Sequence, residues 1–89
     1  MGKMDISVLT PQSTFYSGEI SKLFVTDING SLGILPNHSP LITVLIPSTV
    51  RFVSSDGGEK EFSISQGILK VINNKIVILC DECKWKSEP

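Results

Sequence analysis

The chain has no alanine among its 89 residues, although alanine leads the helix-propensity scale. Instead, 11 Ile, 7 Val and 5 Thr supply β-branched side chains, which lose rotamer freedom in a helix and suit the surface of a sheet. The composition therefore predicts an all-β protein. A chain of this length forms one small domain, because domains usually take roughly 100 to 200 residues.

Long apolar runs and an excess of positive charge are also missing. The longest unbroken apolar stretch, Ile76 to Cys80, is far shorter than the roughly 20 residues that cross a bilayer. Eight Lys and Arg stand against nine Asp and Glu, which gives a net charge of −1 rather than the basic surface of a nucleic-acid binder. The start, MGKMDIS, lacks the apolar region of a secretory signal. We therefore expect a cytosolic protein with no direct membrane insertion and no nucleic-acid partner.

Residues that carry chemistry are few. The only histidine, His38, lies between two prolines, with no acid near it in sequence and no G-x-S-x-G motif to supply a nucleophile. Cys80 and Cys83 form a C-x-x-C pair, but a zinc site needs two more ligands and the chain has no other cysteine. We expect incidental cysteines, with Cys80 ending a buried strand and Cys83 in a polar tail. The sequence thus predicts no catalytic residue, metal or cofactor, and an enzyme that uses both thiols is a minor alternative.

Short apolar segments alternate with turn residues about every ten positions, which is typical of a sandwich or barrel. The expected strands are 4–8, 15–16, 20–28, 31–35, 41–46, 50–53, 59–65, 68–72 and 75–80. Asn29-Gly30 predicts a type I′ hairpin turn with positive φ at both residues, and Asn73-Asn74 suits a second two-residue hairpin. The nearly all-apolar segment 41–46 predicts a central strand.

The segment Asn29 to Pro47, NGSLGILPNHSPLITVLIP, resembles the signature of the epsilon subunit of the F-type ATP synthase, which is called delta in mitochondria. The family pattern is G-x-L/F-G-x-L/Y-P-G-H-x-P-L-x-T-x-L-x-P-G. The matching positions are Gly33, Pro36, His38, Pro40, Leu41, Thr43, Leu45 and Pro47. The opening ISVLTPQSTFYSG and the segment Ile64 to Leu79 resemble the flanking parts of the family, so the likeness covers essentially the whole chain.

The resemblance implies a flattened ten-stranded β-sandwich in the central stalk, or rotor, of a proton- or sodium-driven ATP synthase. Such a subunit catalyses nothing itself; it binds the gamma subunit and the c-ring and couples ion translocation to ATP synthesis. It is peripheral on the cytoplasmic face of the bacterial inner membrane, as part of the complex. By position, the c-ring contact falls on Asn29, Gly30, Ser31 and Leu32, and a contact with gamma or the c-ring falls on His38, Ser39 and Pro40.

Several departures from the family pattern bear on function. Ser31 stands where the family often has an acid, and Asn37 stands where it usually has glycine. Most bacterial members continue into a helical hairpin, whereas we expect here a β-sandwich domain over 1–83 and a short polar tail over 84–89, with no hairpin. We therefore expect coupling without inhibition by that route and without ATP binding. A free-standing β-sandwich that binds a small molecule is the alternative function.

Overall fold

The structure, a computed structural model, describes residues 2–86, where it contains nine β-strands and no helix. This confirms the predicted all-β class. The strands are β1 (Met4–Leu9), β2 (Thr14–Asp27), β3 (Gly30–Ile34), β4 (Leu41–Leu45), β5 (Ser48–Ser54), β6 (Glu59–Ile64), β7 (Gly67–Ile72), β8 (Lys75–Cys80) and β9 (Cys83–Trp85). The end of the predicted tail, 87–89, lies outside the described residues.

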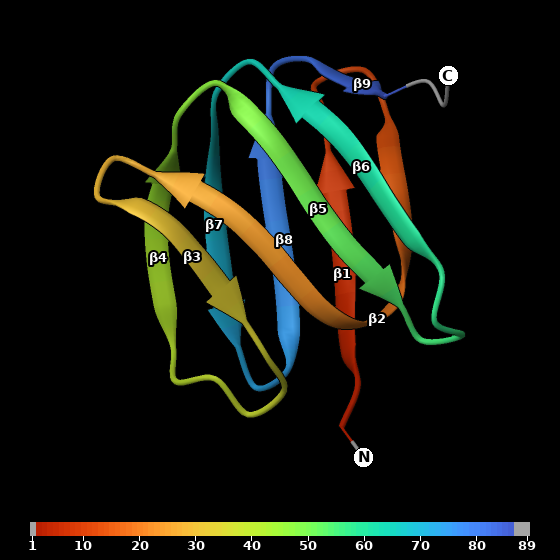
Figure 1. The fold of residues 1–89 in the computed structure, drawn as a ribbon. Helices are drawn as coiled ribbons and strands as arrows, with labels where there is room; N and C mark the ends of the chain where they lie inside the picture. Colours follow the sequence, from red (N-terminus) through yellow and green to blue (C-terminus); the bar gives the residue numbers. More distant parts are fainter. Residues whose placement is uncertain (1, 87–89) are drawn as a thin grey trace.

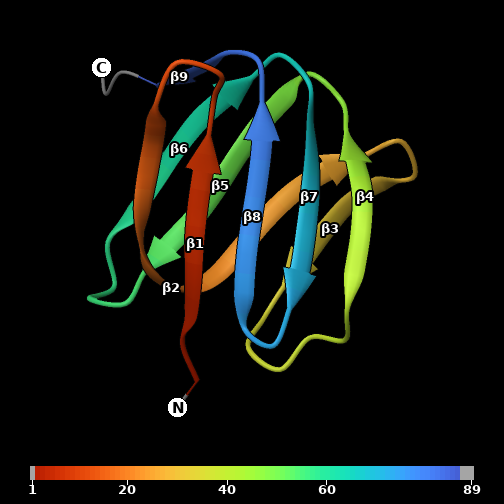
Figure 2. The same cartoon turned by 180° about the vertical axis from the view of Figure 1, so that it is seen from behind.

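The strands form a sandwich of two layers that share β2 (Figures 1 and 2). The back layer runs β1-β8-β7-β4, and the front layer holds β3, β5, β6 and β9. The first part of β2 pairs with β1, whereas its second part lies between β3 and β5. The strands β1 and β8 pair in parallel, with Asp5 beside Lys75. One strand therefore belongs to both layers and ties them together.

The continuity of β2 differs from the sequence prediction of two segments with a turn at Ser17-Gly18. Gly18 lies inside the strand, where a Cβ atom would be 3.0 Å from the hydroxyl oxygen of Tyr16. The glycine therefore makes room for an aromatic ring rather than a turn. The bend that carries β2 between layers comes later, where its pairing with β5 shifts register between Ile20 and Lys22. This continuity helps explain why nine strands form over the described residues.

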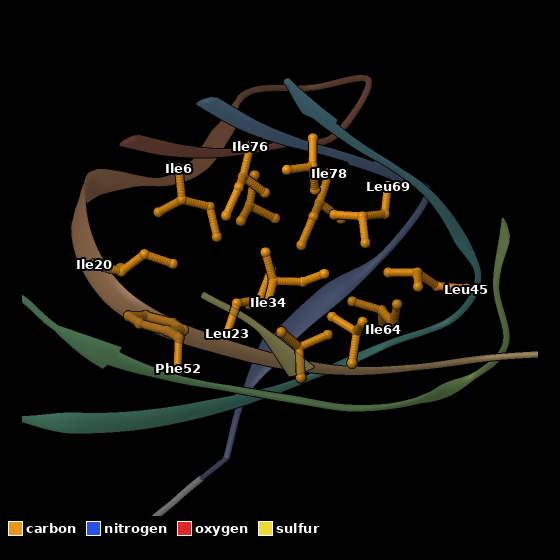
Figure 3. Close-up of a cluster of buried hydrophobic side chains, with 14 of the residues drawn as sticks. Ile6, Ile20, Leu23, Ile34, Leu45, Phe52, Ile64, Leu69, Ile76 and Ile78 are labelled. Carbon is orange, nitrogen blue, oxygen red and sulfur yellow. The ribbon is translucent and has the colours of Figure 1, made fainter. Parts of the chain in front are cut away.

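The core between the two layers consists of apolar side chains that alternate with outward-facing residues along each strand. Figure 3 shows ten of them by name: Ile6, Ile20, Leu23, Ile34, Leu45, Phe52, Ile64, Leu69, Ile76 and Ile78. Each is at most 4% exposed. The space where a ligand-binding sandwich would hold a small molecule is therefore filled with side chains.

The strand β4 is less central than the sequence predicted. It pairs along its length only with β7, and it meets β2 at the single pair Asp27 and Leu45. Ile42 and Val44 point outward and are 71% and 48% exposed. The prediction was wrong because both faces of an apolar strand look alike in the sequence. The sequence does not show whether the chain covers one face or both.

The C-terminal segment also differs from the sequence prediction. Cys83–Trp85 forms β9, which pairs antiparallel with β6 and places Trp85 opposite Phe62. The ring of Trp85 stacks on Phe15 at 4.8 Å between centroids and packs edge-on against Phe62 at 5.7 Å. The boundary expected after Cys83 therefore falls within a strand, and Trp85 closes one end of the sandwich.

The cysteines are not incidental, because the structure joins Cys80 and Cys83 in a disulfide. β8 ends at Cys80 in the back layer and β9 begins at Cys83 in the front layer. The spacing alone did not reveal that the chain reverses between these strands, so the prediction of a tail cysteine was wrong.

Candidate functional site

The predicted c-ring contact lies on the turn between β2 and β3. Asp27 pairs with Gly30, so the two turn residues are Ile28 and Asn29, one position earlier than predicted. Only Gly30 of the Asn29-Gly30 pair has positive φ, at 121°, a conformation that glycine accepts at little cost. By contrast, the predicted hairpin at Asn73-Asn74 is confirmed, with φ of 50° and 62°.

The turn presents an apolar side chain to solvent. Ile28 is 80% exposed at the tip, between a buried acid and a polar neighbour. Asn29 and Ser31 are also exposed, whereas Leu32 packs against the core. Three of the four predicted contact residues, Asn29, Gly30 and Ser31, thus lie at the turn or just after it. The prediction missed Ile28, whose apolar side chain beside a turn was the available signal.

Asp27 holds this turn in place. Its Oδ1 atom accepts the Asn29 N–H at 2.8 Å, and its Oδ2 atom accepts the Thr43 hydroxyl at 3.0 Å. The first bond is an Asx turn, in which an acid side chain replaces a backbone acceptor. The second connects the turn to β4. A side chain that is only 8% exposed thus fixes an otherwise open loop.

The second predicted contact group lies in the loop between β3 and β4. Asn37 has a φ of 69°, so its backbone is in the left-handed region. Asparagine tolerates this region, and the family pattern has glycine at the same position. Its N–H donates to Asn74 Oδ1 at 2.6 Å, and Asn74 Nδ2 donates to Asn37 Oδ1 at 3.2 Å. The turn between β7 and β8 therefore braces this loop.

His38, Ser39 and Pro40 follow in the same loop. The N–H of His38 donates to the Leu35 carbonyl at 3.2 Å, and its Nδ1 atom lies 2.7 Å from the Ser39 carbonyl oxygen. Ser39 and Pro40 are exposed, and His38 is half-buried. Figure 1 shows this loop and the β2–β3 turn at opposite ends of β3. The structure therefore does not bring the two predicted contact groups together.

An apolar row, defined here as Leu9, Leu79, Ile68 and Val44, crosses the outer surface of the back layer. The strand registers place Leu9 beside Leu79, Leu79 beside Ile68, and Ile68 beside Val44. The last three side chains are 47–48% exposed. An open hollow beside the row has a volume of about 550 Å³ and is bordered also by Pro11. The sequence prediction missed this row because it took the apolar run of β4 as buried on both faces.

Charged residues flank the row rather than interrupt it. Ile42 and Lys70 are paired on the neighbouring positions of β4 and β7, and Lys75 lies between Ile72 and Asp5 further along the sheet. An apolar centre with a polar border is typical of protein interfaces. Among residues 2–86, no three His, Cys, Asp or Glu side chains gather as metal ligands would. The same range has no helix long and apolar enough to cross a membrane.

Residues 3–86 match the family model described as "ATP synthase, Delta/Epsilon chain, beta-sandwich domain". The chain belongs to this family. It is 41% identical over 85 residues to the ATP synthase epsilon chain of Clostridium kluyveri, covering 96% of this chain and 64% of that protein. It is 39% identical over 83 residues to the epsilon chain of Clostridium acetobutylicum, covering 93% and 62%. The chain therefore spans less than two thirds of the length of these epsilon-chain relatives.

Chains of two solved ATP synthases have a similar fold. A chain of the Euglena gracilis mitochondrial enzyme, solved with OSCP, F1 and the c-ring, superposes with a TM-score of 0.90 at 15% identity, covering 96% of this chain and 54% of that one. A chain from the central stalk and c-ring of the Tetrahymena thermophila mitochondrial enzyme gives 0.73 at 20% identity, covering 90% and 64%. At these identities the likeness shows the fold alone.

Proposed function

We propose that this chain is a non-catalytic central-stalk subunit of an F-type ATP synthase, which binds the gamma subunit and the c-ring and couples ion translocation to ATP synthesis. In this role it is peripheral on the cytoplasmic face of the bacterial inner membrane and is held there by its partners. The family match over residues 3–86 supports the assignment to an ATP synthase. The apolar row is the main structural support for binding to a partner subunit.

The apolar row fits the gamma subunit as its partner. Exposed apolar side chains on four neighbouring strands form a continuous strip, whereas isolated exposed apolar residues are common on any surface. Lys70, and Lys75 with its neighbour Asp5, give the row a polar border of mixed charge, which suits a partner surface with an apolar centre and a polar rim. His38, Ser39 and Pro40 precede the start of β4, whereas Val44 of the apolar row lies near its end, and these three residues are proposed as a separate contact with gamma or the c-ring.

The turn at Asn29, Gly30, Ser31 and Leu32 is proposed as the c-ring contact. Asp27 pre-orders it, so binding costs little loop entropy. Ser31 carries no charge, so it offers the c-ring no ion pair. The exposed Ile28 at the tip supplies an apolar contact instead, and the neighbouring polar groups supply hydrogen bonds.

Binding to a purified gamma subunit and a detergent-solubilised c-ring from the same source tests the proposal. We expect a stable one-to-one complex with gamma. Replacing Ile68→Thr and Leu79→Thr together should weaken it about tenfold per residue, because each lost apolar contact is worth roughly 1.4 kcal/mol. The variant Ile28→Thr should weaken c-ring binding and leave gamma binding unchanged.

The matched control is Ile72→Thr, the same change at another exposed position of β7 outside the apolar row. It should leave both affinities within about twofold of the parent chain. A failure of the parent chain to bind gamma would overturn the proposed role, and equal losses in Ile72→Thr and Ile68→Thr would show that the apolar row is not the gamma surface.

A further inference from the structure

We propose that Cys80 and Cys83 form a reversible thiol–disulfide exchange site, which takes a dithiol as its reductant and controls how firmly β9 and Trp85 are held on the front layer. Neither cysteine is part of the turn or the loop described above, but Cys80 borders the hollow beside the apolar row, next to Leu79. The thiol count and the amide exchange of β9 are measured on the chain alone, so the test of this proposal does not depend on gamma or c-ring binding.

The disulfide lies at the crossover between the two layers. Only Asp81 and Glu82 separate the end of β8 from the start of β9, so the bond links the two ends of this reversal. One backbone hydrogen bond and one side-chain hydrogen bond also hold the crossover: Ser65 N–H donates to the Glu82 carbonyl at 3.1 Å, and Glu82 N–H donates to Ser65 Oγ at 3.2 Å. These contacts keep the two sulfur atoms near each other after the bond is broken, which favours its reformation.

The two cysteines differ in their exposure to solvent. Cys80 is 6% exposed and borders the hollow beside the apolar row, whereas Cys83 is half-buried and borders a second open hollow, of about 630 Å³, together with Phe15 and Lys84. The greater exposure of Cys83 favours attack of an entering thiolate at its sulfur atom. The Leu9 carbonyl oxygen lies 3.8 Å from Cys80 Sγ, so the thiol released there has an acceptor. The geometry accommodates both the oxidised and the reduced form.

The exchange transfers two electrons and two protons. A thiolate of the dithiol attacks Cys83 Sγ, forms a mixed disulfide and breaks the bond to Cys80, whose thiolate takes a proton from solvent. The second thiol of the reductant loses its proton and attacks the mixed disulfide at the reductant's own sulfur. Cys83 leaves as a thiolate and is protonated, and the reductant departs as its internal disulfide. The oxidised dithiol drives the reverse reaction.

Reduction should loosen β9 because the strand is short, although its pairing with β6 and the packing of Trp85 still hold it. It contains three residues, pairs only with β6 among the described strands, and is followed by the bond from Lys86 N–H to the Glu61 carbonyl at 3.1 Å. Closing the short loop between the cysteines restricts the open state of this segment. Without that restriction the ring of Trp85 should leave its contacts with Phe15 and Phe62 more often. Intracellular disulfides are usually transient or redox-sensing, so a cytoplasmic location would make the bond a response to oxidation.

A redox titration of the chain with reduced and oxidised dithiothreitol tests the proposal. Alkylation and mass measurement should count two thiols under reducing conditions and none under oxidising ones. Trp85, the only tryptophan, reports its own environment by fluorescence, and its emission should shift to longer wavelength with the same midpoint. Amide exchange in β9 should be about twentyfold faster in the reduced chain, as the loop-closure relation gives for four residues.

Two variants separate the redox site from general destabilisation. Cys80→Ser with Cys83→Ser should give one rate of β9 exchange, close to that of the reduced chain, under both conditions. Trp85→Phe should lose the fluorescence signal but keep the change in thiol count. Two free thiols at every ratio of dithiothreitol, or equal β9 exchange in the oxidised and reduced parent chain, would overturn the proposal.

Discussion

Asp27 shows how one side chain shapes a surface that it does not itself form. It is buried, yet each of its oxygen atoms serves a different neighbour: one the turn residue Asn29, the other Thr43 on β4. Ile28, which lies between Asp27 and Asn29 in the sequence, is therefore exposed on an ordered turn. An acid two residues before Asn29 is a recognisable Asx-turn pattern, but the partner on β4 depends on tertiary structure.

Replacing Asp27→Ala should lower the free energy of unfolding by about 1–3 kcal/mol, because the Thr43 hydroxyl and the Asn29 N–H lose their acceptor. Asp27→Asn should cost less, since its amide oxygen can still accept one bond. Urea unfolding measures both. Asp5→Ala, an exposed acid on β1, is the control and should change stability by less than about 0.5 kcal/mol. Equal losses at Asp5 and Asp27 would contradict the role of Asp27.

Asp56 makes the turn between β5 and β6 sensitive to pH. The Ser54 hydroxyl and the Gly58 N–H donate to its carboxylate, and these bonds lower the pKa of Asp56 below its ordinary value of 3.8. Because the folded pKa is the lower one, the turn gains stability above 3.8 and loses it as the pH falls through the folded value. Carboxyl NMR should show a midpoint below 3.8, which rises toward 3.8 in Ser54→Ala. The neighbouring change Ser55→Ala should leave the midpoint unchanged, and an unshifted midpoint in Ser54→Ala would contradict this account.

At the scale of elements, β7 and β8 approach closely where Gly67 pairs with Cys80. A Cβ atom on Gly67 would lie 2.7 Å from the backbone oxygen of Leu79, whereas one on Gly33 would meet only the Phe24 ring at 3.7 Å. The two glycines thus differ in the space around them, although both lie in strands and neither has positive φ.

Replacing Gly67→Ala should therefore destabilise the fold by about 1–3 kcal/mol, the usual cost of overpacking, because the strands must move apart. Gly33→Ala should be neutral or slightly stabilising, since alanine restricts the unfolded chain without a clash. Thermal or urea unfolding of the two variants gives the comparison. A Gly33→Ala variant as unstable as Gly67→Ala would show that strand propensity, rather than close approach, sets the cost.

Most elements were predictable from alternation, and the exceptions have physical causes. The strands β7 and β8 and the Asn73-Asn74 turn follow the sequence prediction closely. Alternation shows which side chains share a face but not which strand lies beside them. The continuous β2, the single pair that joins β4 to β2, and the short β9 depend on pairing with distant segments, so local sequence did not reveal them.

At the scale of the whole molecule, the surfaces lie on a small body of 31 × 29 × 25 Å. The apolar row covers the outside of the back layer, the β2–β3 turn lies beyond the end of β4, and the His38 loop lies at the other end of β3. The family pattern predicted which segments face partners, and these remain proposals. It did not predict the apolar row, because that row comes from strand registers across four separate parts of the chain.

The parallel pairing of β1 with β8 sets the order in which the fold can close. β1 is made before its parallel neighbour β8, because Lys75 follows Asp5 by 70 residues. At about 5–20 residues per second, β1 therefore waits roughly 4–14 seconds for its second partner. During that time it pairs only with the early part of β2 and offers its other edge to any chain nearby. The edge of β1 is thus open to misassociation until β8 has been made.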